Sequence, residues 1–150
     1  MTTTSSSSHF TKPPPLIGAL LRLPWEEVQR RMLARLHERG FDDLDAAHLN
    51  VFQYPGPEDA RPSELAARLR ISKQALNYLL GELERLGYLE RRAHPDDLRS
   101  RRVVVTRRGK AAIAVIREAV CEVERDWAKK LGPRRFAQLR GLLLELNQPT

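Results

Sequence analysis

Cysteine is scarce in this sequence, and the long apolar runs of membrane proteins are missing. One cysteine, Cys121, among 150 residues has no partner for an intramolecular disulfide and leaves no cysteine cluster for a structural zinc ion. No uninterrupted apolar run approaches the roughly 18–20 residues that cross a bilayer. A disulfide-stapled secreted domain and a membrane span are therefore excluded. Because the N-terminal residues also lack the pattern of a secretory signal, we expect a cytoplasmic protein without a membrane partner.

The usual arrangements of catalytic and metal-binding residues are absent as well. The sequence contains neither a glycine-rich phosphate loop nor a G-x-S-x-G motif. Its four histidines show no i, i+4 pair and no cysteine or carboxylate partner pattern. Cys121 is followed by Glu122 and Glu124 rather than by basic residues that would favour its thiolate, so we interpret it as a buried structural residue and not as a redox sensor. We expect no enzymatic activity, no cofactor and no metal site.

What the sequence does have is a large excess of positive charge. It contains 26 Lys and Arg residues against 19 Asp and Glu residues, which gives a net charge of +7. Hydrophobic residues make up 41% of the chain, enough for a folded core. The positive charge indicates a polyanionic partner, either nucleic acid or an anionic membrane surface.

The two ends of the chain differ in composition. Residues 1–15 are rich in Ser, Thr and Pro and predict a disordered tail. Residues 16–40 show helical periodicity, with Pro24 either kinking one helix or opening a second one, and Gly40 ending it. Residues 111–150 predict two more helices, separated by Gly132 and Pro133. Their apolar seams are Ile113, Ile116, Val120, Val123 and Trp127 on the first, and Phe136, Leu139, Leu143 and Leu146 on the second.

Residues 41–110 contain shorter elements. A short helix is expected over residues 44–52, and a second helix begins at Pro62, which suits a first helical position. Ser72 is a good N-cap for a third helix that ends at Gly87. The residues expected to face inward on this third helix are Ala75, Leu76, Leu79, Leu83 and Leu86. Residues 88–92 and 101–106 predict two strands joined by a turn over residues 93–100.

This order of helix, helix, tight turn, helix and basic hairpin is typical of a winged helix-turn-helix. The expected fold class is therefore mostly α with a small β-hairpin wing (α+β). The third helix would enter the major groove of double-stranded DNA with its polar face, where Asn and Gln pair with base edges. The expected recognition residues are Ser72, Lys73, Gln74, Asn77 and Tyr78. The alternative is a helix pair with an ordinary polar face.

The distribution of charge supports DNA binding. Residues 88–110 contain eight basic and three acidic side chains, and residues 61–80 contain four and one. Arginines that merely face solvent would be spread more evenly, whereas a DNA-binding face concentrates them. We expect phosphate contacts from Arg70, Arg91, Arg101 and Arg102.

The sequence resembles the MarR family of transcriptional regulators over residues 16–147. The most specific part is Asp97-Leu98-Arg99, followed by Val103-Val104-Val105-Thr106 and Gly109, which is similar to the family's wing motif D-x-R ending in L-T-x-x-G, with Val105 in place of the usual Leu. Residues 63–66 and 83–91 also resemble the family's pattern. The resemblance implies that Arg99 enters the minor groove and that Asp97 helps to orient it. The alternative for this pair is a simple ion pair at the hairpin tip.

The resemblance also implies a homodimer formed by the helices of residues 16–40 and 111–150, which flank a DNA-binding region at 41–110. Apolar side chains on these helices exceed what the central region can cover, in agreement with a dimer, although the same helices could also form an intrachain bundle. Family members often bind small aromatic or phenolic effectors. The residues that could line such a pocket, or else fill the core, are Trp25, Arg30, Phe41, His48, Phe52 and Tyr54.

The sequence thus predicts a sequence-specific DNA-binding regulator, a ligand-responsive repressor that acts as a homodimer on a pseudo-palindromic operator. The alternative is a winged-helix module that binds protein or RNA without operator specificity.

Overall fold

Six helices and one antiparallel hairpin make up residues 12–149, the part of the chain that the computed structural model describes. In order they are α1 (Ile17–Glu38), α2 (Ala46–Val51), α3 (Pro62–Leu69), α4 (Lys73–Arg85), β1 (Leu89–His94), β2 (Asp97–Val105), α5 (Arg107–Leu131) and α6 (Pro133–Leu146). The predicted fold class is confirmed. Of the predicted tail, residues 1–11 lie outside the described residues, and residues 12–15 are exposed coil.

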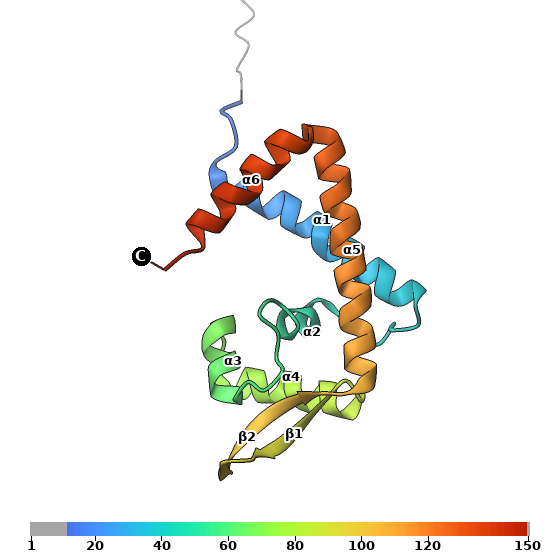
Figure 1. The fold of residues 1–150 in the computed structure, drawn as a ribbon, viewed down its shortest axis with the longest axis vertical. Coiled ribbons are helices and arrows are strands. Elements are labelled where there is room, and N and C mark those ends of the chain that lie inside the picture. Colours follow the sequence, from blue (N-terminus) through green and yellow to red (C-terminus); the bar gives the residue numbers. More distant parts are fainter. Residues whose placement is uncertain (1–11, 150) are drawn as a thin grey trace, which may run out of the picture.

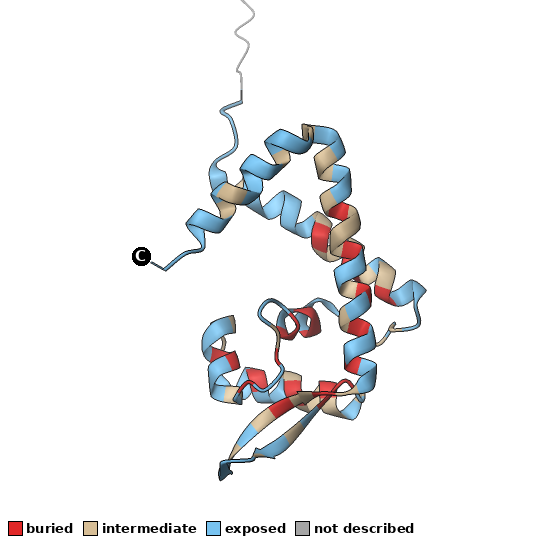
Figure 2. Ribbon diagram, viewed as in Figure 1, coloured by how far each residue is buried: buried red, intermediate tan, exposed pale blue. Residues whose placement is uncertain are grey.

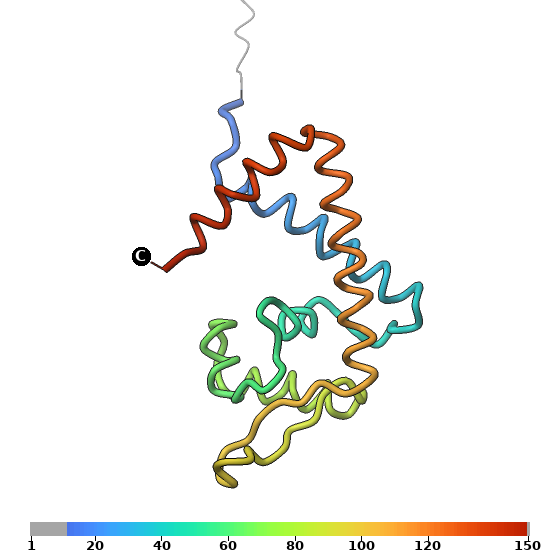
Figure 3. Tube along the Cα trace, viewed as in Figure 1, coloured from blue at the N-terminus to red at the C-terminus, as the bar shows by residue number. Residues whose placement is uncertain are grey.

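Helix α5 connects two parts of the molecule. At one end lie α2, α3, α4 and the hairpin, which we call the head; at the other, α6 folds back from α5, and α1 crosses α5 between the two (Figure 1). The Cα trace reverses direction where α5 gives way to α6 (Figure 3), at the predicted break of Gly132 and Pro133. The head is thus held on a long helix that is continuous with its wing.

Helix α1 is a single helix that includes Pro24. Of the two alternatives that the sequence left open, Pro24 therefore lies within one helix and does not open a second one. It ends as predicted: Gly40 adopts φ +87°, a conformation that favours glycine, and the Phe41 N–H donates to the Leu36 carbonyl over 2.8 Å. Only the second half of α1 carries buried residues, namely Val28, Met32 and Leu36.

Ion pairs join the C-terminal part of α1 to the middle of α5. Three arginines one turn apart, two on α1 and the third at its C-cap, meet three acidic residues one turn apart on α5: Arg31 with Asp126, Arg35 with Glu122 (2.6 Å) and Arg39 with Glu118 (3.1 Å). Each pair is partly exposed and therefore stabilises the fold by about 1 kcal/mol at most. The repeated spacing nevertheless fixes the antiparallel register of the two helices.

Two helices of the head, α3 and α4, begin where the sequence predicts. Pro62 opens α3, and the Ser72 hydroxyl accepts a hydrogen bond of 3.0 Å from the Ala75 N–H at the start of α4. Helix α2 is shorter than residues 44–52, because the Asp45 side chain caps it one residue before Ala46.

The buried face of α4 differs from the prediction. The buried residues are Leu76, Leu80 and Leu83, whereas Ala75 is exposed and Leu79 and Leu86 are not fully buried. The apolar arc of this helix is wide enough for several stripes, and packing against the other helices of the head selects the one centred on Leu80. The prediction of an inward Ala75 is wrong, since this residue lies on the outer surface of α4.

The hairpin is longer than predicted. Its turn is confined to Pro95 and Asp96 between the two strands, so residues 97–100 belong to β2 and not to a turn. The outer edge of β2 is covered as well: the Asp59 N–H donates to the Val103 carbonyl, and the Val103 N–H donates to the Ala60 carbonyl, each over 2.9 Å. The hairpin base therefore has neighbours on both sides of β2.

Helix α5 begins at Arg107, before the predicted residues 111–150, because Thr106 caps it by accepting a 3.1 Å hydrogen bond from the Gly109 N–H. Its buried stripe is Gly109, Ala112, Val115, Ala119 and Val123, whereas the other residues of the predicted seam, Ile113, Ile116, Val120 and Trp127, are half-buried beside it. Figure 2 shows this stripe along the side of α5 that faces α1 and the head. Small side chains on the stripe allow α5 to approach its neighbours closely.

Tyr88, fully buried, lies where the head joins α5. Its ring packs against Phe41 and Phe52, and the Arg108 guanidinium lies 4.4 Å from its centroid. Its hydroxyl donates to the Asp43 carboxylate, which also accepts a 3.0 Å hydrogen bond from Arg108. Burial, followed by the Asp43 carboxylate, raises the pKa of Tyr88 well above its ordinary value. Although burial acts to raise the pKa of Asp43, the hydrogen bond from Tyr88 and the charge of Arg108 lower it overall.

We expect Tyr88→Phe to lower the free energy of unfolding by about 1.5–3 kcal/mol, since it removes a hydrogen bond to a charged partner. Because the folded pKa of Tyr88 is raised, the wild type loses stability as the pH rises above about 10, where the unfolded phenol ionises. The difference between variant and wild type should therefore shrink in alkali. Urea unfolding at several pH values measures it, with Tyr54→Phe, at a fully solvated tyrosine, as the control. An equal effect of both variants would contradict the role of the Tyr88 hydroxyl.

Candidate nucleic-acid interface

The outer face of α4 presents the polar side chains that the sequence predicts. All five expected recognition residues are exposed: Ser72, Lys73, Gln74, Asn77 and Tyr78. The buried stripe on the opposite side holds the helix against the head, so this face is directed away from the core. Ala75 adds an exposed methyl group to the outer surface of α4.

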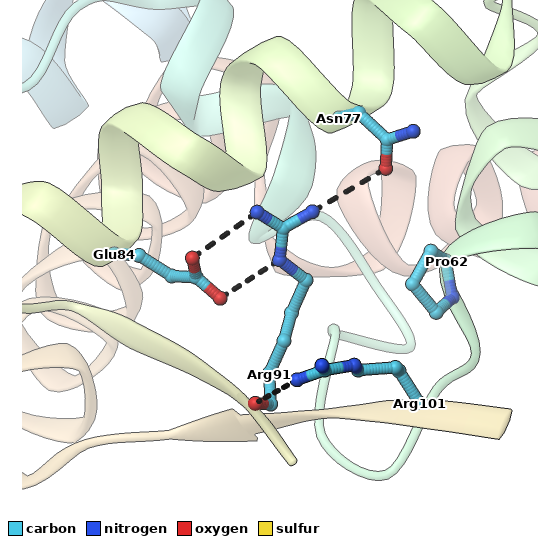
Figure 4. A pocket seen from close by; sticks show the side chains of 5 residues that line it. All are labelled: Pro62, Asn77, Glu84, Arg91 and Arg101. Carbon is cyan, nitrogen blue, oxygen red and sulfur yellow. Dashed lines mark hydrogen bonds and ion pairs between the residues drawn. The ribbon is translucent and has the colours of Figure 1, made fainter. Parts of the chain in front are cut away.

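A cleft of about 460 Å³ separates this face from the wing. Its lining residues come from α3, α4 and both strands: Pro62, Asn77, Glu84, Arg91 and Arg101. Figure 4 shows Asn77 and Glu84 reaching down from α4 and Arg91 reaching up from β1 between them. Four of the five lining residues are polar or charged, so the cleft belongs to the polar surface of the head.

Arg91, one of the predicted phosphate contacts, is half-buried and paired with a residue of α4. Its Nε and Nη2 donate to the two carboxylate oxygens of Glu84 over 2.8 and 3.1 Å. Glu84 raises the pKa of Arg91, so the guanidinium stays charged. Sequence reasoning missed Glu84, because the two residues are seven positions apart in different elements and meet only when β1 packs against α4.

Arg102 is likewise paired and not free. Its Nη1 donates to the Asp59 carboxylate over 2.6 Å, and its Nε is buried without a partner among the described residues. In the register of the hairpin, Arg102 lies opposite Arg92, whereas Arg101 lies opposite Ala93 on the other face of the sheet. The two neighbouring arginines therefore point to opposite faces, and of the two it is Arg101 that lines the cleft.

The remaining predicted DNA contacts are accessible. Arg70 lies exposed in the turn between α3 and α4 with φ +53°, and Arg101 and Arg99 are exposed along β2. The Asp97 carboxylate accepts a 3.0 Å hydrogen bond from the backbone N–H of Arg99. This contact involves the backbone of Arg99 and leaves its guanidinium charge uncompensated by Asp97. Among the described residues, the two side chains form no ion pair with each other.

The six predicted effector residues lie in different parts of the fold. Phe41 and Phe52 pack on Tyr88, and His48 is buried in the head with its Nε2 3.0 Å from a Glu82 carboxylate oxygen. The other three lie elsewhere and face solvent at least in part: Trp25 and Arg30 on α1, and Tyr54 after α2. His48 and Phe52 are thus buried in the head, and Phe41 is half-buried against the same core.

Both terminal helices leave large apolar side chains exposed. On the first part of the chain these are Leu16, Ile17, Leu20, Leu21, Leu23 and Trp25; on α6 they are Leu139, Leu142, Leu144 and Leu146. Between α1, α5 and α6 lies an apolar hollow of about 370 Å³, lined mainly by Leu23, Pro24, Trp127, Leu131 and Leu139. No residue of α6 is buried within the described chain.

Two further findings concern other functions. Across residues 12–149, no helix combines the length and hydropathy that spanning a membrane requires. The described side chains include no group of three or more His, Cys, Asp or Glu residues placed to hold a metal ion. Cys121 is half-buried on α5.

Comparison with known proteins finds a family match within the head. The sequence model of the MarR family matches residues 49–100, which span α2 to the beginning of β2. No curated protein matches the chain. Among solved structures, a transcriptional regulator from Thermotoga maritima is 27% identical, with 87% of this chain and 90% of that chain covered and a TM-score of 0.59.

Two other solved structures cover almost the whole chain. Wild-type MarR of E. coli in its apo form is 25% identical, with 91% of this chain and 100% of that chain covered and a TM-score of 0.68. CouR of Rhodococcus jostii, solved with p-coumaroyl-CoA bound, is 21% identical, with 89% of this chain and 93% of that chain covered and a TM-score of 0.67. The latter likeness concerns the fold alone.

Proposed function

We propose that this chain, which belongs to the MarR family of winged-helix transcriptional regulators, is a sequence-specific repressor that binds a pseudo-palindromic operator as a homodimer. The observation that carries the proposal is the single surface formed by the outer face of α4, the cleft and the wing. Asn77 and Gln74 on α4 would read base edges in the major groove, and Arg99 at the wing tip would enter the adjacent minor groove.

The exposed apolar side chains of α1 and α6 support the homodimer. Large exposed apolar patches are rare on monomeric proteins, and a second copy of the same helices would cover these side chains with two-fold symmetry. Such a dimer would place two copies of α4 on half-sites about one turn of DNA apart.

We further propose that a small aromatic or phenolic ligand weakens operator binding. Its support is the fold shared with CouR, which holds p-coumaroyl-CoA. A ligand that prefers the conformation unable to bind DNA would lower the population of the bound form. Titrating candidate aromatic acids into a protein–operator mixture tests this, and unchanged operator affinity with all of them would count against it.

Selection of bound duplexes from a random pool tests the proposed function directly. We expect a consensus with two inverted half-sites. A protein that ignores duplex DNA at about 50 mM salt, where electrostatic binding is strongest, would instead fit the alternative of a winged-helix module for protein or RNA.

We expect Arg101→Ala to weaken binding to every duplex alike. Arg101 is exposed beside the cleft, so its loss removes a phosphate contact and not a base contact. The slope of log K against log salt should fall by about one. Arg102→Ala is the matched control, because Arg102 is already paired with Asp59, and a salt slope that Arg101→Ala leaves unchanged would remove Arg101 from the interface.

A further inference from the structure

Arg91 contacts two residues of α4 at once. While Nε and Nη2 engage Glu84, its Nη1 donates to the Asn77 Oδ1 over 3.4 Å. Asn77 and Glu84 are seven residues apart, about two helical turns, so both side chains project from the same side of α4. The guanidinium therefore bridges a fixed carboxylate and a residue of the recognition face, as Figure 4 shows.

The chemistry of this bridge determines which way the Asn77 amide faces. A guanidinium has five N–H donors and no acceptor, so the atom of Asn77 that meets it must be the carbonyl oxygen. The amide nitrogen, with its two donors, is then turned away from Arg91 (Figure 4). Glu84 holds the guanidinium by two charge-assisted hydrogen bonds, which keeps the donor in place.

We propose that Arg91, anchored by Glu84, is a positioning residue that makes Asn77 a donor toward the major groove and so sets its preference for guanine. Guanine presents two acceptors there, N7 and O6, whereas an asparagine that pairs with adenine must offer its oxygen to the N6 amino group as well as its nitrogen to N7. With Oδ1 turned to Arg91, the adenine pairing is disfavoured. This inference rests on the proposed function.

Selection from a random pool, repeated with variants, tests the proposal. Asn77→Ala identifies the base position that Asn77 reads, because the preference there is lost. At that position the wild type should favour guanine, and Arg91→Met, which keeps the stem but removes the donors, should shift the ratio of adenine to guanine upward by about five- to tenfold. Glu84→Gln, nearly the same in shape, should shift it in the same direction. Arg92→Met is the control, since Arg92 pairs with Glu90 instead.

Exchanging the two charges gives a stricter test. In the double variant Glu84→Arg with Arg91→Glu, the carboxylate at position 91 can only accept, so it should bind the Asn77 amide nitrogen and turn the oxygen outward. The preference at this position should then move to bases that present an amino group, adenine or cytosine. Thermal unfolding of each variant verifies that the head is folded. If the double variant does not fold, the base preference of Glu84→Gln decides the test.

The outcomes separate this inference from the proposed function. If the wild type binds no duplex, the proposed function fails and the inference with it. If the wild type binds its operator but Arg91→Met keeps the base preference, the inference alone is overturned. It is also overturned if Arg91→Met weakens all sequences equally and lowers the salt slope by about one, since Arg91 would then be a phosphate contact.

Discussion

Gly109→Ala should destabilise the protein by about 3 kcal/mol, one of the two largest effects that we expect. A Cβ atom at this position would lie 2.2 Å from the carbonyl oxygen of Tyr88 and 2.7 Å from a methyl carbon of Val105. The Tyr88 carbonyl cannot move away easily, because it accepts a 3.1 Å hydrogen bond from the Thr106 N–H. The helix would have to shift from the hairpin base at the point where α5 joins the wing.

Urea unfolding measures this effect, with Gly81→Ala as the matched control. Gly81 also lies inside a helix, but a Cβ there would meet nothing within 4 Å. We expect that substitution to stabilise the protein by about 0.4–1 kcal/mol, because alanine restricts the unfolded chain. If both variants unfold at the same urea concentration, the close approach of α5 to Tyr88 is wrong.

The double variant Leu142→Glu with Leu146→Glu is expected to separate the proposed dimer. The two side chains are one turn apart on α6 and are 59% and 78% exposed, so charges there leave the fold of one chain intact but oppose burial against a second copy. Without the partner, the two heads no longer bind as a unit. Affinity for a duplex with two half-sites should fall by about 10²–10⁴-fold, whereas affinity for a single half-site should not change.

Sedimentation and gel shift on the same samples measure the two parts of this result. Tyr54→Glu is the control, because Tyr54 is a fully exposed aromatic residue outside α1 and α6. A double variant that sediments like the wild type and binds the full operator equally well would place any dimer interface elsewhere.

The element order could be predicted from the sequence because local chemistry determines it. Pro62 at the start of α3 and Ser72 before α4 act within one helical turn of the backbone that they influence. Gly40 ends α1 through its own backbone conformation. Such features need no knowledge of distant residues, and each of these three was predicted correctly.

The face that each helix buries could be predicted only in part. Residues 75–86 of α4 and its C-cap contain so many apolar side chains that periodicity permits more than one stripe, and Leu80 became the centre only through packing. On α5, small residues such as Ala112 and Ala119 are buried, because the helix lies close to its neighbours there. Hydrophobicity alone favoured the larger Ile113 and Val120.

For the candidate site, the sequence identified which residues are exposed on α4 but not which arginines are already paired. Arg91 and Arg102 look like any other basic residue of a wing until the fold brings Glu84 and Asp59 to them. A pattern of neighbouring residues does not show which ion-pair partner another element of the fold will bring to an arginine.

The backbone bonds from the segment of Asp59 and Ala60 to Val103 have a mechanical consequence for the wing. These bonds add a short third segment beside the two-stranded hairpin. The base of the hairpin therefore cannot move independently of the chain that leads into α3. We therefore expect the wing to bend most around Leu98 and Arg99, which lie beyond these bonds. If the wing binds DNA whose groove is curved or narrowed, only its tip would bend. The base of the hairpin would keep its distance from α4.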